Sequence, residues 1–150
     1  MRTYQYPAVF TPDEDGGFVV TFPDVPEAIT QGDTIEKCIE EGADALEEAF
    51  IGRMKGQESL PEPSSSRQGQ YVIPLPPQTA FKAALYDAIR SRPLNKVEMA
   101  ALLGIDEKEV RRLLDPRYSS KLPRVAEVLG RMGKRVVISI EDEAELATHS

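Results

Sequence analysis

The N-terminal part of the chain alternates apolar and polar residues, which is the period of a half-buried β-strand. The runs 3–10 and 18–22 have this period, and the turn-forming sequence TPDEDGG between them predicts an antiparallel hairpin. Because Pro7 has no N–H to donate, we expect the first strand to lie at an edge of its sheet or to carry a bulge. A short third strand is predicted over 28–31, where Gly32 stops it.

After Gly32 the apolar residues recur with the period of an amphipathic helix. Asp33 or Thr34 can cap this helix, and Glu36 would complete a capping box with Asp33. The apolar stripe consists of Ile35, Cys38, Ile39, Leu46, Ala49, Phe50 and Met54. Gly42 lies on the same face, which predicts a close approach between the helix and the sheet.

Residues 56–69 are poor in apolar side chains and rich in Ser, Pro and Gly, which predicts a flexible loop. Residues 71–75 then predict a fourth strand that joins the N-terminal sheet. The expected fold class is therefore α+β. Its first domain, residues 1–76, has the order β-β-β-α-β, with one helix on one face of a small antiparallel sheet.

The stretch 95–116, NKVEMAALLGIDEKEVRRLLDP, has the pattern of two short helices joined by a glycine turn. Each helix begins with a potential capping box, Asn95 with Glu98 in the first and Asp106 with Glu109 in the second. The glycine between them can take the left-handed conformation that ends the first helix. The pattern predicts a tight helical pair.

This pair resembles the DNA-binding helix-turn-helix in the spacing of Ala100, Gly104 and Val110, and the second helix of that motif enters the major groove. Arg111 and Arg112 are the best candidates to read bases, because Arg can bind O6 and N7 of guanine. The residues expected at DNA are Asn95, Lys96, Asp106, Glu107, Lys108, Arg111, Arg112, Arg117, Tyr118, Ser119, Ser120 and Lys121. The alternative is a generic helical hairpin with solvated charges, and the acids at the start of the second helix count partly in its favour.

Residues 77–141 are expected to form one helical domain around this pair. A helix that begins at Gln78 or Thr79, and another over 122–132, would support it. The β-branched run 134–140, KRVVISI, predicts a strand, which must pair because a lone strand is not stable in water. Its partner is the first domain's sheet or the same strand of a second copy; we favour the second copy, because a DNA reader gains from two-fold symmetry. The expected dimerisation residues are Val136, Val137, Ile138 and Ile140.

Composition argues against several classes of protein. No run of about 18 apolar residues occurs, so no membrane span is expected, and the N-terminus lacks the apolar region of a signal peptide. The single cysteine, Cys38, excludes an internal disulfide and is expected in the core. The single histidine, His149, lies in an acidic tail, residues 142–150, that we expect to fray. These features predict a cytoplasmic protein without a cofactor.

The charge of the chain is divided between its halves. The net charge is −7, but residues 1–60 hold 4 Lys/Arg and 13 Asp/Glu, whereas residues 61–140 hold 14 Lys/Arg and 8 Asp/Glu. An acidic half joined to a basic half indicates two partners of opposite charge. The basic half suits DNA, and the acidic half suits a basic protein.

The sequence YPAVFTPDEDGGFVVTFPDVPEAITQGDTIEKCIEEGADALE resembles the N-terminal domain of HicB family antitoxins. The matching features are the strand ending at Phe10, the acidic Asp-Gly-Gly turn, the FPD of residues 22–24, and the ITQGDT before the helix. Pro26, Glu27 and Ala28 depart from the usual PGC of the family. The C-terminal sequence LLDPRYSSKLPRVAEVLGRMGKRVVISI resembles that of members with a helix-turn-helix and a closing strand.

The resemblance implies that this chain neutralises a HicA toxin, a small basic ribonuclease of double-stranded-RNA-binding-like fold with a catalytic histidine. It implies a reduced ribonuclease H-like first domain that covers the toxin. It also implies a C-terminal domain that self-associates, as a homodimer or higher oligomer, and binds operator DNA to repress its own operon. We expect the toxin at the sheet face or edge, through steric cover and charge mimicry of RNA. The residues expected there are Asp13, Glu14, Asp15, Phe18, Val20, Phe22 and Asp24.

Two other functions are open to this sequence. A nuclease could hold two metal ions with the acids Asp13, Glu14, Asp15, Asp24, Asp33 and Glu36. Three of these acids share one glycine-containing turn, which is typical of solvated turn residues, so we expect neither catalysis nor a metal site. A stand-alone transcription regulator, whose acidic domain senses a ligand or dimerises, would lack a stable basic protein partner.

Overall fold

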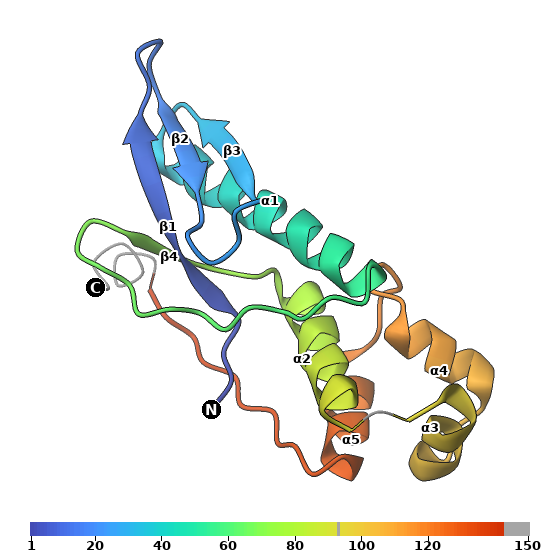
Figure 1. The fold of residues 1–150 in the computed structure, drawn as a ribbon. Coiled ribbons are helices and arrows are strands. Elements are labelled where there is room, and N and C mark those ends of the chain that lie inside the picture. The colour runs from blue at the N-terminus through green and yellow to red at the C-terminus, as the bar shows by residue number, and fades with distance from the viewer. Residues whose placement is uncertain (93, 143–150) are drawn as a thin grey trace. The chain divides into compact units, whose positions relative to one another are not determined.

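The computed structural model describes residues 1–92 and 94–142 (Figure 1). The predicted α+β class is confirmed, because a four-stranded sheet and one helix are followed by four further helices. The elements are β1 (Gln5–Pro12), β2 (Phe18–Thr21), β3 (Ile29–Gly32), α1 (Ile35–Lys55), β4 (Tyr71–Pro74), α2 (Pro77–Ser91), α3 (Lys96–Leu103), α4 (Glu107–Leu114) and α5 (Leu122–Arg131). Residues 143–150 of the predicted acidic tail, with His149, lie outside the described residues.

Contacts divide the chain into two compact units. The sheet unit contains residues 1–52 and 61–76, with residues 140–142, and the helical unit contains residues 53–60 and 77–139. Among the helices that are described, none is both long enough and apolar enough to cross a membrane.

The four strands are antiparallel and lie in the order β3-β2-β1-β4. β1 lies between β2 and β4 in this order, so the expectation of an edge strand or a bulge was wrong for the strand as a whole, but each half of β1 pairs on one side only. Its first half, Gln5–Ala8, pairs with β4, and its second half, from Val9 onward, pairs with β2. Pro7 is tolerated because the half of β1 that contains it has only one neighbouring strand.

Helix α1 covers one face of the sheet, and the predicted apolar stripe forms the core there (Figure 1). The buried residues of this core include Tyr6, Ala8, Val20, Phe22, Cys38, Leu46, Phe50 and Ile73. The close approach expected at Gly42 is confirmed, since a Cβ at that position would lie 2.8 Å from Cδ1 of Ile73. Burial, and then the charge of Asp33, raise the pKa of the Cys38 thiol.

The segment between α1 and β4 has no regular structure, as expected, but it is anchored at two points. The carbonyl oxygen of Pro61 accepts hydrogen bonds from the Tyr6 hydroxyl (2.7 Å) and from Nη2 of Arg2 (2.8 Å). The carboxylate of Asp24 accepts from the backbone N–H (2.9 Å) and the hydroxyl (3.0 Å) of Ser64. These bonds tie the segment to the ends of the sheet strands.

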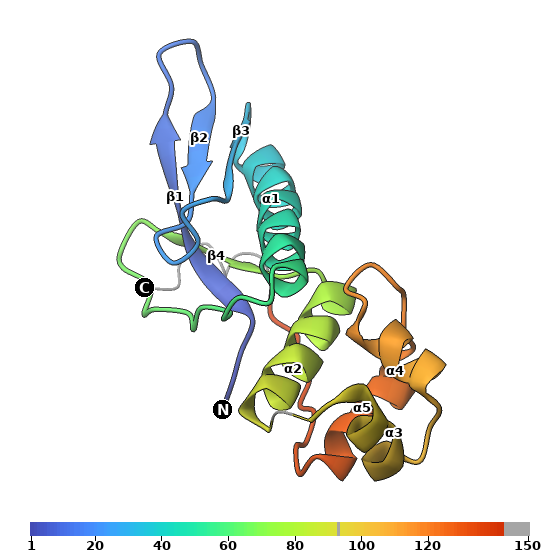
Figure 2. The same ribbon diagram turned by 45° about the vertical axis from the view of Figure 1, so that its right-hand side comes forward.

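In the helical unit, α2 packs against α4 and α5, and α3 packs against α4 and α5, so that the short pair α3 and α4 lies beside α2 and α5 (Figure 2). Its core cluster consists of Leu85, Ala88, Leu103, Leu113, Val125, Val128 and Leu129. Six of these side chains come from α2, α4 and α5, and α3 supplies Leu103. Each helix therefore buries an apolar stripe that it could not bury alone.

The strand predicted over 134–140 does not form in the single chain. These residues have no regular structure, and the described sheet contains no fifth strand that would pair with them. Val137 and Ile138 are about three-fifths exposed, and Ile140 is 91% exposed. A β-branched run without a neighbouring strand has no partner for its backbone groups, which explains why it stays irregular here.

Candidate functional site

The helical pair begins and ends as its local sequence predicts. The Asn95 side chain accepts from the N–H of Glu98 (2.8 Å), whose carboxylate accepts from the N–H of Asn95 (3.1 Å), so the first capping box is confirmed. Gly104 ends α3 in the left-handed conformation, with φ 67°. Asp106 caps α4 by accepting from the N–H of Glu109 (2.7 Å).

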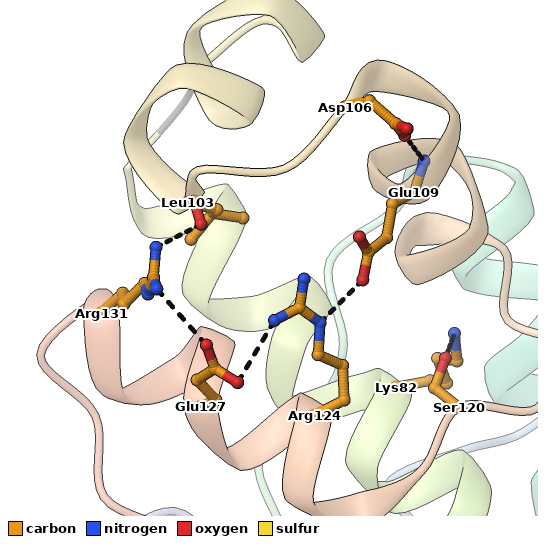
Figure 3. A network of polar contacts seen from close by, with 8 residues as sticks. All are labelled: Lys82, Leu103, Asp106, Glu109, Ser120, Arg124, Glu127 and Arg131. Carbon is orange, nitrogen blue, oxygen red and sulfur yellow. Dashed lines mark hydrogen bonds and ion pairs between the residues drawn. The ribbon is translucent and has the colours of Figure 1, made fainter.

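The second capping box was predicted wrongly, because the carboxylate of Glu109 points to α5 instead. It accepts from Nε of Arg124 at 2.7 Å (Figure 3). Arg124 also pairs with Glu127, which in turn pairs with Arg131, and Arg131 donates to the carbonyl oxygen of Leu103. The Glu109 carboxylate, followed by that of Glu127, raises the pKa of the Arg124 guanidinium. This network ties α5 to both helices of the pair.

The outward face of α4 is basic. Lys108, Arg111 and Arg112 are exposed at positions i, i+3 and i+4, whereas Val110 and Leu113 are buried on the opposite face. Side chains three and four residues apart lie side by side on a helix, so the three cations form one patch. We call Lys108, Arg111 and Arg112 the basic face of α4.

The acids near α4 are mostly engaged in contacts of their own. Asp106 caps the helix, Glu109 pairs with Arg124, and Asp115 accepts from the backbone N–H of Arg117 (3.0 Å). Glu107, also expected at DNA, is exposed in the first turn. Of the two acids at the start of α4 that counted against DNA in the sequence, Asp106 is therefore used as the helix cap, whereas Glu107 remains an exposed negative charge.

The segment 115–121 follows α4, and most of its side chains are exposed. The ring of Tyr118 is 43% exposed and lies 5.4 Å from the guanidinium carbon of Arg112. Arg117, Ser119 and Lys121 are exposed as well. Asn95 and Lys96 are also exposed, at the start of α3, but the Asn95 side chain is occupied by its capping bonds.

Ser120 differs from its neighbours, because it is half-buried and contacts α2. Its hydroxyl accepts from Nζ of Lys82 at 2.8 Å (Figure 3), and its N–H donates to Oε1 of Gln78 at 2.8 Å. The hydroxyl therefore faces the interior of the unit. The expectation that Ser120 itself contacts DNA does not fit this geometry.

Lys82 was missed by sequence reasoning. It is only 2% exposed, and its ammonium also donates to the carbonyl oxygens of Arg112 (2.9 Å) and Leu113 (3.1 Å). Burial lowers its pKa to about 8, while the negative charge of Asp115 acts in the opposite direction. The sequence offered one signal for this burial. Lys82 lies three residues before the buried Leu85, so both side chains fall on neighbouring positions of the same helix face.

The acidic turn of the sheet unit is fully at the surface. Asp13, Glu14 and Asp15 are exposed between β1 and β2, where Gly16 and Gly17 have φ of 93° and 72°. Positive φ favours glycine, which explains the Asp-Gly-Gly sequence of the turn. Three adjacent acids on a protruding hairpin form a concentrated negative surface.

The partner residues expected on the strands need correction. Val20 is fully buried and Phe22 is 2% exposed, because both point toward α1, so neither is available to a partner. Phe18 is half-buried beside Phe10 at a ring distance of 6.4 Å. Asp24 is half-buried, and its carboxylate accepts hydrogen bonds from Ser64.

The opposite face of the sheet is the surface that the sequence analysis overlooked. The strand register places Val9, Thr11, Val19, Thr21, Ile29 and Gln31 together on this outer face. None of these residues is charged, and Ile29 is 62% exposed. We call these six residues the outer sheet face.

The acids that the sequence analysis considered as metal ligands are not brought together at one place by the fold. Within residues 1–92 and 94–142, no group of three or more His, Cys, Asp and Glu side chains is arranged to hold a metal ion. The acids of the turn point into solvent from a hairpin, which is unlike the rigid convergence that a two-metal nuclease requires.

Comparisons with known proteins define the family. A family model described as the HicB_like antitoxin of bacterial toxin-antitoxin system matches residues 5–84. Antitoxin HicB 1 of Photorhabdus laumondii is 36% identical over 141 residues, which is 94% of this chain and 90% of that protein. Antitoxin HicB of Escherichia coli (strain K12) is 32% identical over 132 residues, which is 88% of this chain and 96% of that protein. The chain belongs to the HicB-like antitoxin family. The family model ends at residue 84, within α2, whereas the alignment with Antitoxin HicB 1 covers 94% of the chain.

Proposed function

We propose that this antitoxin blocks a small, basic ribonuclease toxin with its sheet unit and binds operator DNA with its helical unit. Its DNA binding would repress its own operon, and the protein would act in the cytoplasm without catalysis of its own. The observation that carries the proposal is the placement of opposite charges on two separate units: exposed acids on the hairpin turn of one and exposed cations on α4 of the other.

The toxin surface that fits best combines the acidic turn with the adjacent outer sheet face. Asp13, Glu14 and Asp15 supply charge complementary to an RNA-binding protein, and Ile29 with the β-branched residues beside it supplies uncharged contact area. Val20 and Phe22 are left out because they are buried, and the half-buried Phe18 lies on their face, next to the acidic turn and not on the outer sheet face. Charge would accelerate association and the uncharged face would slow dissociation.

Co-expression tests the toxin function. The tagged full chain is produced with the product of the small gene beside its own, and the purified complex is assayed for ribonuclease activity before and after denaturing separation. We expect a basic protein to co-purify and to regain ribonuclease activity when the antitoxin is removed. A chain that binds operator DNA but recovers no basic partner would instead be a stand-alone transcription regulator.

The DNA surface is the basic face of α4, extended by Arg117, Tyr118, Ser119 and Lys121. A three-residue turn between α3 and α4, residues 104–106, fits the short connection of a DNA-binding helix-turn-helix. In that arrangement the outward side chains of the second helix reach base edges, and nearby loop residues contact phosphates. Binding of the full chain to the duplex upstream of its own gene, with weaker binding to a scrambled duplex of equal length, is the expected result.

The exposure of residues 137–140 supports self-association through them, whereas Val136 is half-buried against the core of the helical unit and is left out of the proposed contact. Val137, Ile138 and Ile140 present an apolar run whose backbone has no strand partner in one chain, and the same run of a second copy would supply one. Two copies would also place two recognition helices on a pseudo-palindromic operator. Sedimentation analysis should give a dimer or higher oligomer, and Ile138→Lys should reduce it to a monomer.

A further inference from the structure

Helix α2 holds the segment 115–121 by hydrogen bonds to Ser120, and the Lys82 ammonium also lies 5.9 Å from the ring centroid of Tyr118. Ser120 is held at both its backbone and its side chain, by Gln78 and Lys82 respectively, at 2.8 Å in each case. Gln78 and Lys82 are four residues apart on α2 and so lie side by side on one face of that helix. A segment held at one residue by two bonds loses much of the freedom that an irregular connection would otherwise have.

The same lysine also fixes the end of α4. Its ammonium donates to the carbonyl oxygens of Arg112 and Leu113, which belong to the last turn of the helix; the Arg112 carbonyl also accepts from the N–H of the C-cap residue Asp115 at 3.3 Å. Three acceptors use the three N–H groups of the ammonium. If Lys82 loses its proton, two N–H groups remain for the carbonyls and the Ser120 hydroxyl can donate to the amine. The geometry therefore stays satisfied in both protonation states.

The arrangement joins two parts of the proposed DNA surface. Arg112 stands on α4 and Tyr118 on the following segment, and their side chains lie 5.4 Å apart. Ordering a flexible segment when DNA binds would cost conformational entropy, and a segment that is already ordered avoids that cost. Phosphate contacts are the ones that benefit, since the exposed residues beside Ser120 are cationic or hydroxyl-bearing.

We propose that Gln78 and Lys82 are positioning residues that hold segment 115–121 as a preformed contact for DNA phosphates, with Ser120 as their anchor and not as a DNA contact. This inference rests on the proposed operator binding. It assigns a function in DNA binding to a helix, α2, whose own side chains need not touch DNA.

The test compares Gln78→Ala and Ser120→Ala with the control Ser91→Ala, which removes a serine hydroxyl at the other end of α2. Affinities of the full chain are measured by fluorescence anisotropy for the upstream duplex and for a scrambled duplex, over a series of salt concentrations. Each of the two variants should bind both duplexes roughly fivefold more weakly, as expected for one lost hydrogen bond. The salt dependence should become shallower because phosphate contacts are lost, while the preference between duplexes stays unchanged.

Amide hydrogen exchange of the free protein provides a readout that does not depend on DNA. Exchange over 115–121 should be faster in Gln78→Ala and Ser120→Ala, whereas Ser91→Ala should match the wild type. Gln78→Glu keeps an acceptor oxygen for the Ser120 N–H and should restore slow exchange.

Three outcomes would overturn the inference. If the wild type binds DNA and both variants bind with unchanged affinity, Gln78 and Lys82 do not position the DNA contact. A loss confined to the upstream duplex would make Ser120 a base contact. If the wild-type protein binds neither duplex, the proposed operator binding is wrong, and the positioning role of Gln78 and Lys82 is wrong as well.

Discussion

The sheet unit and the helical unit expose charge of opposite sign for different structural reasons. In the sheet unit, Asp13, Glu14 and Asp15 occupy a hairpin turn, where side chains point into solvent whatever the core requires. In the helical unit, Asp106, Glu109 and Asp115 near α4 are used in a cap, an ion pair and a turn, and Glu107 is the one acid of α4 that stays exposed without such a contact among those described. The cations are left on the outward face. The comparison teaches that the sign of a surface depends on which charges the fold engages and not on composition alone.

Structural damage to one unit should leave the other functional, and we expect this to be the largest effect. Gly42→Val places a branched side chain where a Cβ alone would lie 2.8 Å from Ile73, so the sheet unit should lose about 1–3 kcal/mol of its free energy of unfolding. Gly52→Val is the control, because no atom lies within 4 Å of a Cβ there. Thermal unfolding measures the loss, and DNA binding should persist in both variants. Equal destabilisation by both substitutions would contradict the packing at Gly42.

Removal of one cation from the basic face of α4 should affect DNA binding only. Arg111→Ala is expected to weaken binding to the upstream duplex by about 1–3 kcal/mol and to relax the preference at one base pair. Arg67→Ala, an exposed arginine of the sheet unit, should leave the affinity unchanged. An equal loss on every DNA sequence would show that Arg111 contacts only phosphate.

Reversing the charge of the acidic turn should change the association with the toxin and leave DNA binding intact. We expect this effect to be smaller than that of Arg111→Ala on DNA binding. Asp13→Lys combined with Asp15→Lys should slow association and remove most of its salt dependence, because the charges act at long range. Glu36→Lys combined with Asp44→Lys changes the net charge equally but on α1. Stopped-flow association rates at low and high salt separate a local effect of the turn from an effect of net charge.

The smallest expected effect is a pH dependence of stability from Lys82. Its pKa is about 8 in the folded protein and near its ordinary value of 10.5 when unfolded. Between these two pKa values the folded state binds fewer protons than the unfolded state, so the free energy of unfolding should rise with pH. The slope of that rise cannot exceed the slope for a difference of one bound proton. Urea unfolding from pH 7.5 to about 10.5 should show this rise in the wild type and a flatter profile in Lys82→Met. An identical slope in both proteins would show that Lys82 is not the titrating group.

The order of elements and the helix boundaries were readable from the sequence because they depend on neighbouring residues. Alternation defined the hairpin, and the Asn95–Glu98 capping box and Gly104 defined the limits of α3. Gly42 also predicted the close packing of α1 against the sheet, because a glycine within an apolar stripe indicates that there is no room for a side chain at that position. Local signals of this kind act within a few residues of the chain.

The identity of the surfaces depended on contacts between distant residues. Alternation showed that Phe18, Val20 and Phe22 share a face, but only α1 decided that this face is the buried one and that Val19, Thr21 and Ile29 lie outside. Glu109 fits a capping box by spacing, yet Arg124 of α5 offers its carboxylate a charged partner, and that bond is stronger than one to a neutral N–H.

The sequence by itself therefore determined the helices, the four strands of the sheet, the division of charge and the family resemblance of this protein, but it also predicted a strand over 134–140 that does not form in the single chain. Only the tertiary structure decided which residues are free to meet a partner. The burial of Lys82 under α4 and the inward turn of Ser120 follow from helices that are far apart in the chain and packed together in space. No periodicity records such contacts, because their free energy arises from atoms that become neighbours only when the chain has folded.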